Sequence, residues 1–299
     1  MQKRVISLGF FDGVHQGHAA LLGVACQRAC DLGASPAVLT FDTHPTTQTQ
    51  GEAIPLINAL PGRVELIKRL HNIQDILVVP FNQTFRQLPW DGFVTTLKET
   101  YGAVHLVCGH NYHFGYGGKG DPERLQAKCK ELGIGADVVA EVKLDGKTVS
   151  STLIRTLLAN GDMETAARFL GHPHTLVDTV RHGFELGRTL GAPTINMTFP
   201  TGVLVPPRGV YATQVFLPGE GSGHTAVTNI GYRPTVSGDG ERLTVESYIL
   251  GFSGNLYDQQ VRVEFHRFLR PEIKFASVED LKEQIQRDIQ AAEGYFSNN

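Results

Sequence analysis

Apolar residues follow two different patterns along the chain, and the change between them falls near residue 172. Up to about residue 142, short continuous apolar runs alternate with segments whose apolar residues recur every three or four positions. Such runs are typical of parallel strands buried on both faces, and the longer spacing is typical of covering helices. The runs span residues 5–8, 36–41, 75–81, 104–108 and 137–140. This alternation predicts an α/β domain, a doubly wound parallel sheet with helices on both faces.

Beyond residue 172, strand-like runs follow one another without helices between them. They span residues 176–180, 210–217, 225–230, 243–250 and 261–268. Successive strands of this kind predict an antiparallel β-barrel or sandwich. A terminal helix with Ser277 as its N-cap and an apolar stripe that indicates packing completes this half. We therefore predict two domains, residues 1–171 and 172–299, divided where a short helix ends at Gly171.

Composition narrows the classes of function. The 299 residues are 41% hydrophobic and 19% charged, with a formal net charge of −3. This balance excludes a strongly basic surface for nucleic acid, so any nucleotide is expected to be a small molecule. Apolar runs stay well below the roughly 18 residues of a transmembrane helix, and the four cysteines form no CxxC pair. We expect a cytoplasmic protein with small-molecule substrates, no nucleic-acid or membrane partner, and a monomeric or weakly homo-oligomeric state.

The stretch from Gly9 to His18 carries the strongest sign of chemistry. It reads Gly-Phe-Phe-Asp-Gly-Val-His-Gln-Gly-His and joins the first predicted strand to the first predicted helix. A Gly-rich turn at a helix N-terminus is suited to binding phosphate. His15 and His18 can donate hydrogen bonds to one anion and, when protonated, offset charge that develops during phosphoryl or nucleotidyl transfer. The alternative is a tight connection in which a histidine only caps the helix.

Aromatic side chains also gather after the next predicted strands, where ligands bind in doubly wound sheets. Those after the second and third strands are Phe41, His44, Phe81 and Phe85. After the fourth strand, residues 109–120 place aromatic and imidazole rings among five glycines. The glycines let the backbone approach a ligand closely, and the rings offer flat faces to a planar one. His110 and His113 would suit a metal, but no third ligand accompanies them.

Two further segments allow both a structural and a functional interpretation. In residues 150–155, Ser-Ser-Thr-Leu-Ile-Arg, the hydroxyls either cap a helix or face nucleotide phosphates together with Arg155. In residues 183–196, glycines let backbone amides line a phosphate site, although the same residues could form an ordinary turn. If Ile195 points away from an extended segment, the oxygens of Thr194 and Asn196 share one side and suit Mg²⁺.

The motifs of the first half resemble those of bacterial bifunctional riboflavin kinase/FAD synthetases and occur in the same order. They are residues 15–18 (the HxGH signature of nucleotidyltransferases), 41–45, 109–115 and 150–155. The resemblance implies a Rossmann-like nucleotidyltransferase domain that adenylylates FMN. It implies that His15 and His18 contact the ATP phosphates, with Asn111 and Arg155 close to the reacting groups. It also implies nucleotide contacts by Gly9, Phe11, Gly17, Ser151 and Thr152, and flavin contacts by Phe41, His44 and Phe114.

The second half resembles riboflavin kinases. Residues 193–196, Pro-Thr-Ile-Asn, are similar to the Pro-Thr-x-Asn signature of these enzymes, and further matches follow at 207–211, 229–235, 245–247 and 269–272. The resemblance implies a β-barrel that phosphorylates riboflavin with ATP and Mg²⁺, so that flavins are substrate and product. It implies that Thr194 and Asn196 hold Mg·ATP and that Glu246 is the base for the ribityl hydroxyl. The remaining implied contacts are Gly187 and Gly191 with the nucleotide, and Arg270 and Phe275 with the flavin.

Two departures and two rival functions accompany these matches. Many family members carry Asn where this chain has Phe10 and Arg where it has Leu153, but neither change removes a residue with an implied catalytic role. One rival is a nucleotidyltransferase for another small substrate, whose second domain only binds; the complete set Thr194, Asn196 and Glu246 argues against it. The other is a flavin-binding regulator with degenerate sites, which predicts missing catalytic residues. For Glu246 alone, the alternative is a solvent-facing strand residue.

Overall fold

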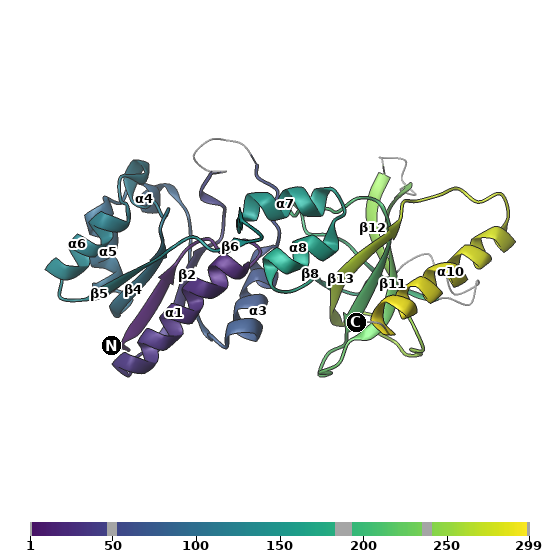
Figure 1. Cartoon of the computed structure of the whole chain (residues 1–299), viewed down its shortest axis with the longest axis horizontal. Coiled ribbons are helices and arrows are strands. Elements are labelled where there is room, and N and C mark those ends of the chain that lie inside the picture. The colour runs from purple at the N-terminus through teal and green to yellow at the C-terminus, as the bar shows by residue number, and fades with distance from the viewer. Residues whose placement is uncertain (1, 47–52, 183–192, 235–240, 298–299) are drawn as a thin grey trace. The chain divides into compact units, whose positions relative to one another are not determined.

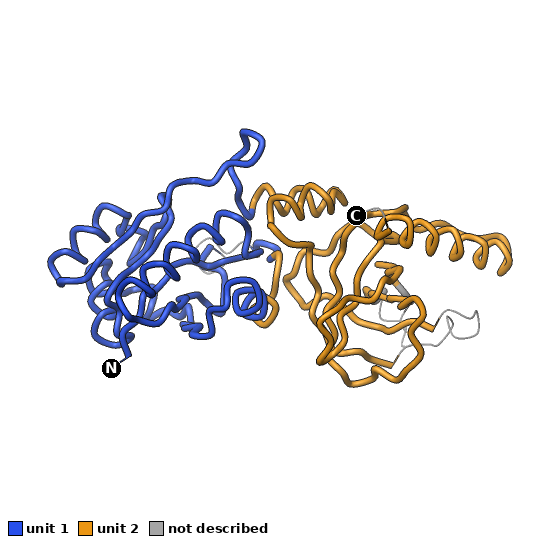
Figure 2. The backbone as a smooth tube through the Cα atoms, turned by 60° about the horizontal axis from the view of Figure 1, so that its bottom comes forward, with its two compact units in different colours: residues 1–56, 63–151 blue, residues 57–62, 152–299 orange. Residues whose placement is uncertain are grey.

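The computed structural model describes residues 2–46, 53–182, 193–234 and 241–297 (Figure 1). The chain divides into two compact units (Figure 2). The first comprises Met1–Leu56 and Arg63–Ser151, and the second comprises Ile57–Gly62 and Thr152–Asn299. The α/β pattern of the sequence lies in the first unit and the run of β-strands lies in the second.

The first unit is built on a five-stranded parallel sheet, as predicted. Its strands are β1 (Arg4–Leu8), β2 (Ser35–Phe41), β3 (Asp75–Val79), β4 (Ala103–Gly109) and β5 (Gly135–Val139). They are arranged in the order β3-β2-β1-β4-β5, and the central strand β1 buries four of its five residues. The direction of winding reverses between β1 and β4, which is the switch point where sheets of this kind bind ligands.

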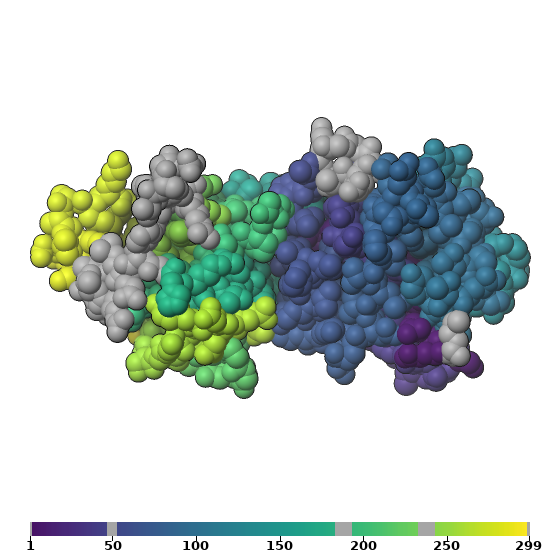
Figure 3. Space-filling view, turned by 180° about the vertical axis from the view of Figure 1, so that it is seen from behind, coloured from purple at the N-terminus to yellow at the C-terminus, as the bar shows by residue number. Residues whose placement is uncertain are grey.

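Helices cover both faces of this sheet. α1 (Gln16–Leu32) and α3 (Leu60–His71) pack on one face, and α5 (Trp90–Glu99) and α6 (Pro122–Glu131) pack on the other (Figure 1). Alternate residues of β1 serve the two cores: Val5 packs with the α1 side and Ile6 with the α5 side. On the face that Figure 3 shows, only small purple patches from the start of the chain reach the surface of this unit.

The segment between the two patterned halves contains a hairpin that the hydrophobic pattern did not predict. β6 (Lys143–Leu144) and β7 (Lys147–Thr148) are joined by Asp145 and Gly146, both with positive φ. Two helices follow, α7 (Ser151–Ala159) and α8 (Met163–Leu170). α8 begins at the Asp162 cap and ends at the left-handed Gly171, as predicted.

The division between the compact units falls after Ser151, whereas the predicted domain boundary falls after residue 171. The helices α7 and α8 account for the difference. α8 packs against the last strand and the first strand of the second unit, so its contacts group it with that unit. The domain boundary at residue 171 stays a prediction.

The second unit is a curled six-stranded antiparallel sheet, in agreement with the predicted barrel. Its strands are β8 (His174–Thr179), β9 (Thr194–Met197), β10 (Gly209–Phe216), β11 (His224–Pro234), β12 (Glu241–Ile249) and β13 (Gln260–Arg270). They are arranged in the order β8-β13-β10-β11-β12-β9. The two edges meet just after β8, where the Arg181 amide donates to the Asn196 carbonyl of β9 at 2.9 Å.

The terminal helix α10 (Val278–Ser297) lies against β10 and β11. Ser277 caps it as predicted, because its hydroxyl accepts a hydrogen bond from the Asp280 amide at 3.1 Å. Of the predicted apolar stripe only Ala292 is fully buried, and Val278 is 51% exposed. The other buried residue of this helix is Asp288, so an ion pair, described below, joins the apolar contacts in holding α10.

A chain of buried hydroxyls shows which face of this sheet points inward. Thr213, Thr228 and Ser247, on the adjacent strands β10, β11 and β12, are fully buried and hydrogen-bonded at 2.7 Å from each to the next. Successive side chains of a strand point to opposite faces. Asn229 and Glu246, next in sequence to two of these residues, therefore belong to the outer face.

His174 is the most buried histidine of the second unit, with 1% of its surface exposed. Its ring is nearly parallel to that of Phe199 and tilted relative to that of Phe265. Burial, followed by the charge of His172, lowers the pKa of His174 to about 3. In the unfolded chain a histidine has a pKa of about 6.5. Below that pH the unfolded state binds a proton that the folded state does not, so this unit should lose stability as the pH falls from 6.5 toward 3.

We expect this one group to reduce the free energy of unfolding by about 1.4 kcal/mol per pH unit in that window. His174→Phe should remove this contribution and leave the similar contribution of His266, whose pKa burial lowers to about 4, so the slope between pH 6 and 5 should fall by roughly half. Hydrogen exchange of peptides from the second unit at pH 7, 6 and 5 measures how the stability of this unit depends on pH. Tryptophan fluorescence cannot replace it, because the single tryptophan, Trp90, lies in the first unit. The exposed His110 of the first unit, changed to Phe, is the control. An unchanged slope in His174→Phe would contradict the assignment.

Candidate active sites

The Gly9–His18 turn places two stacked imidazoles at the N-terminus of α1. His15 is the N-cap, and its Nδ1 accepts a hydrogen bond from the His18 amide at 3.3 Å. The two rings lie 3.6 Å apart and nearly parallel, at 13°. Gly17 leaves room for this stack, because a Cβ at that position would lie 3.1 Å from the His15 ring. The histidines thus lie at a helix N-terminus, where the helix dipole favours an anion.

The environment of His18 favours its neutral form. Burial lowers the pKa of this imidazole well below its usual value, and the nearby charges of His15, Arg63 and His71 lower it further. Two neutral rings can stack at 3.6 Å without repulsion, whereas two imidazolium ions would repel each other. Among the described residues, Nδ1 of His18 has no hydrogen-bond partner, so this ring retains a polar atom for a ligand or water.

Two other chain segments reach the ends of the central strands. Asn111 is exposed and lies two residues after the end of β4, the neighbour of β1 in the sheet. The Ser151 hydroxyl donates to the Asp12 carbonyl at 3.0 Å, so the start of α7 is tied to the histidine turn. Thr152 and Arg155 follow on α7 beyond the unit boundary, and Arg155 lies one helical turn after Ser151.

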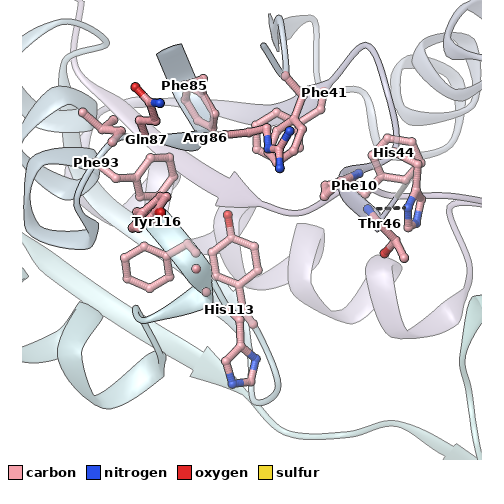
Figure 4. A pocket seen from close by; sticks show the side chains of 18 of the residues that line it. Phe10, Phe41, His44, Thr46, Phe85, Arg86, Gln87, Phe93, His113 and Tyr116 are labelled. Carbon is pink, nitrogen blue, oxygen red and sulfur yellow. Dashed lines mark hydrogen bonds between the residues drawn. The ribbon is translucent and has the colours of Figure 1, made fainter. Parts of the chain in front are cut away.

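A pocket of about 1140 Å³ lies in the first unit and is lined mainly by aromatic rings. Figure 4 shows Phe10 and His44 at one end of it and Phe85 and Phe93 at the other. Phe41, at the carboxyl end of β2, lies between these groups with its ring 5.1 Å from Phe81 and 5.3 Å from Phe85. The further lining includes Tyr112, His113, Phe114 and Tyr116 from the loop after β4.

The pocket has the dimensions and chemistry of a site for a planar ligand. Predicted flavin contacts Phe41, His44 and Phe114 all line it. Aromatic walls favour a flat ring system through stacking and edge contacts, and the volume is ample for a molecule of drug-like size. Phe11 is different, because its side chain is 1% exposed and packs in the core beside Gly9. Any nucleotide contact of Phe11 would therefore come from its backbone.

In the second unit, strand register brings three predicted residues onto one outer face. Asn196 of β9 is paired directly with Glu246 of β12, and Thr194 is paired with Tyr248 two positions along. Directly paired residues project from the same face with Cβ atoms about 5 Å apart. On the other side of Glu246, β11 contributes Asn229 in register. The result is a row of amide, carboxylate and amide across three strands.

This row provides oxygen ligands of the kind that Mg²⁺ prefers. The hydroxyl of Thr194, the amide oxygen of Asn196 and the carboxylate of Glu246 are hard donors on adjacent strands. Thr194 and Asn196, the predicted ligands, have the oxygen chemistry that such an ion requires, and Glu246 lies beside Asn196. The described residues contain no cluster of three or more His, Cys, Asp or Glu with metal-binding geometry, and His110 and His113 form none.

A second pocket, of about 530 Å³, adjoins Thr194. Pro193, Thr194 and Ile195 form one side, and the loop of residues 252–257 forms the other. The ring of Tyr257, in that loop, stacks on His182 at 3.8 Å. The predicted nucleotide-binding Gly187 and Gly191 lie outside the described residues.

Arg270 is held by the terminal helix. Its guanidinium makes a bidentate ion pair with the buried Asp288 of α10, at 2.6 Å from Nη2 to Oδ2. Gln284 donates to the same carboxylate at 2.9 Å, and the guanidinium lies 6.0 Å from the ring centre of Phe275. The two predicted flavin contacts are therefore neighbours. The ion pair thus joins Arg270, at the end of β13, to the middle of α10.

Comparison with known proteins assigns both halves of the chain. The FAD synthetase family model matches residues 1–153 and the riboflavin kinase family model matches residues 170–296. This chain is 39%, 36% and 33% identical to the bifunctional riboflavin kinase/FMN adenylyltransferases of Pseudomonas fluorescens, Bacillus subtilis and Escherichia coli K12. The matches cover 96%, 99% and 98% of this chain and 91%, 93% and 92% of the relatives. This chain belongs to the bifunctional riboflavin kinase/FMN adenylyltransferase family.

A solved structure shares the fold. A crystal structure described as a macrolide-efflux protein from Streptococcus pneumoniae matches with a TM-score of 0.84 and 28% identity, over 98% of this chain and 94% of its own. Its name describes that protein alone. In the part of this chain that the structure describes, no helix is long and apolar enough to cross a membrane.

Several residues of the two sites were not predicted for this riboflavin kinase/FMN adenylyltransferase chain. Phe10 was noted only as a departure, yet it lines the aromatic pocket. Phe93, a buried residue of α5, also lines that pocket. Asp178 binds Arg181 and accepts from the Thr198 amide at 2.9 Å, which fixes the chain next to β9. The spacing of these residues in the sequence does not predict that they lie at the sites, because only the fold brings their segments together.

Proposed function

We propose that the protein makes FAD from riboflavin in two ATP-dependent steps, one at each site. The observation that carries this proposal is the presence of two separate sets of polar residues, each in the unit matched by the corresponding family model. The second unit would phosphorylate riboflavin to FMN, and the first would transfer AMP from ATP to FMN. FMN, the product of one step, is the substrate of the next.

In the kinase step, the terminal ribityl hydroxyl of riboflavin attacks the γ-phosphorus of ATP. A new O–P bond forms, the bond from the γ-phosphorus to the bridging oxygen breaks, ADP leaves, and Glu246 accepts the hydroxyl proton. Thr194 and Asn196 would hold Mg²⁺, which neutralises charge on the phosphates when bound. The pocket beside Thr194 is the proposed place for the base of ATP, and Arg270 and Phe275 would contact the flavin.

In the adenylyl-transfer step, an oxygen of the FMN phosphate attacks the α-phosphorus of ATP. The new P–O bond joins FMN to AMP, and pyrophosphate leaves with the electrons of the broken bond. His15, His18 and the amides at the start of α1 would bind the phosphates and stabilise the charge that develops on them. Asn111 and Arg155 would orient the same groups, and the aromatic pocket would hold the isoalloxazine ring of FMN.

An assay of the purified full-length protein tests this function. Riboflavin, ATP and Mg²⁺ are supplied together and the flavins are separated by chromatography, with FMN and ATP supplied in a parallel reaction. We expect FMN and FAD from the first mixture and FAD from the second. Riboflavin left unconverted would refute the kinase step, and FMN left unconverted in the second mixture would refute the adenylyl transfer.

We further propose a cytoplasmic location and small-molecule substrates only. All four cysteines are free thiols, and two of them, Cys108 and Cys129, are buried in the core of the first unit. Unpaired cysteines are typical of proteins in a reducing compartment. The monomeric or weakly oligomeric state stays a prediction, which light scattering at assay concentration would test.

A further inference from the structure

The first turns of α3 bury an arginine beneath the aromatic pocket. Arg63 has no surface exposed to solvent. Its guanidinium carbon lies 3.9 Å from the ring centre of Phe10, and Nη2 donates to the carbonyl of Phe41 at 2.6 Å. Phe10 and Phe41 both line the pocket; Phe10 follows β1, and Phe41 is the last residue of β2. One side chain therefore contacts two walls of the pocket from behind.

A charged side chain at this position is costly for the fold. Among the described residues, Nε and Nη1 of Arg63 have no hydrogen-bond partner, so two of its polar atoms are desolvated without a hydrogen bond. Burial lowers the pKa of Arg63 to about 10, although Asp12 and Asp42 oppose the change, and the group stays charged at neutral pH. An apolar side chain of similar volume would usually stabilise such a site as well or better. The arrangement therefore indicates a task beyond packing.

The neighbours of Arg63 connect it to both parts of the adenylyltransferase site. Asp42 accepts a hydrogen bond from the amide of Phe81, a third residue of the pocket, at 2.9 Å. Asp12 lies in the histidine turn, where its carbonyl accepts from Ser151. Both carboxylates attract the guanidinium electrostatically, and the positive charge of Arg63 contributes to the lowered pKa of His18. The turn and the aromatic pocket thus share one buried cation.

We propose that Arg63 is a positioning residue for FMN adenylylation, which sets the Phe10 and Phe41 walls of the aromatic pocket and the electrostatic field at His18. The proposal rests on the proposed adenylyltransferase function of the first unit. The planar guanidinium stacks on one ring while it hydrogen-bonds the backbone of the other wall, which a lysine ammonium cannot reproduce. The positive charge of Arg63 opposes protonation of His18, as do the charges of His15, the N-cap of α1, and His71, on α3.

Two substitutions separate these two roles. Arg63→Lys keeps the charge and loses the planar fork, so the titration of His18 should stay as in the parent while the KM for FMN rises roughly tenfold. Arg63→Met removes the charge as well, so the KM for FMN should rise and the pKa of His18 should also move upward. Arg69→Met is the matched control, since Arg69 lies on the same helix in an exposed ion pair with Glu65.

The measurements are steady-state kinetics of FAD formation from FMN, FMN binding followed by the fluorescence of Trp90, and NMR titration of labelled histidines. Thermal unfolding followed by the fluorescence of Trp90, which lies in the first unit, reports on folding of each variant. A KM for FMN that stays at the parent value in Arg63→Lys would overturn the positioning role. A His18 titration that stays unchanged in a folded Arg63→Met would overturn the electrostatic role. If Arg63→Met does not fold, the lysine variant alone decides the positioning role, and Arg63→Gln replaces it in the titration.

Failure of the underlying function gives a different result. A parent protein that forms no FAD would refute the proposed adenylyltransferase activity, whatever the variants do. The titration of His18 would still respond to Arg63→Met in that case, because it depends only on the geometry of the free protein. The two failures are therefore distinguishable.

Discussion

Replacing Glu246 with glutamine is expected to stop riboflavin phosphorylation while added FMN is still converted to FAD. Glutamine keeps the size and the oxygen of the side chain but cannot accept the hydroxyl proton. Loss of a positioned general base usually costs about 10²- to 10⁴-fold in rate. The register places this carboxylate beside Asn196, a proposed Mg²⁺ ligand, and the proton it accepts is transferred in the chemical step, so the loss should appear mainly in kcat.

The design of this test uses the second reaction as its internal control. The parent, Glu246→Gln and Glu293→Gln are each given riboflavin or FMN, with ATP and Mg²⁺, and the flavins are quantified. Glu293 is an exposed carboxylate on α10, and its change should leave both reactions unaffected. Riboflavin phosphorylation at the parent rate in Glu246→Gln would remove this residue from the mechanism. Loss of both reactions would show that the two sites are not independent.

The strands of the first unit could be predicted because they are buried on both faces. β1, β2 and β4 appear as continuous apolar runs, and burial of this kind leaves a clear sequence pattern. The rule that ligands bind at the carboxyl ends of such strands then located Phe41, His44 and Phe114 at one pocket. The hairpin at Asp145 and Gly146 was missed, although an Asp-Gly pair is a recognised turn signal.

The features that escaped prediction depend on contacts between distant segments. β9 is only four residues long, and the pairing of Asn196 with Glu246 is a matter of register that no local pattern specifies. Arg63 sits in an amphipathic helix, where a charged residue normally faces solvent, yet it is fully buried. The ion pair of Arg270 with Asp288 likewise joins the end of a strand to a helix position where a charged residue predicts solvent exposure, although Asp288 is buried.

His15→Ala should abolish FAD formation while riboflavin is still phosphorylated, so that FMN accumulates. Removing one preorganised donor from a developing oxyanion typically costs about 10²- to 10³-fold. The change also removes the side-chain cap of α1, because Nδ1 of His15 accepts from the His18 amide. Loss of a cap costs about 1 kcal/mol, so the thermal midpoint of the first unit is measured alongside the kinetics.

A pair of glycine substitutions separates the position of His15 from the stability of its helix. A Cβ at Gly17 would lie 3.1 Å from the His15 ring, so Gly17→Ala should displace the imidazole and lower the rate of FAD formation. A Cβ at Gly23, on the same helix, meets no atom within 4 Å. Gly23→Ala should therefore leave the rate unchanged and stabilise α1 by up to about 1 kcal/mol. Equal activities in the two alanine variants would mean that adenylyl transfer does not depend on the placement of His15. A slow Gly17→Ala beside a normal Gly23→Ala would tie the reaction to the stacked histidines at the start of α1.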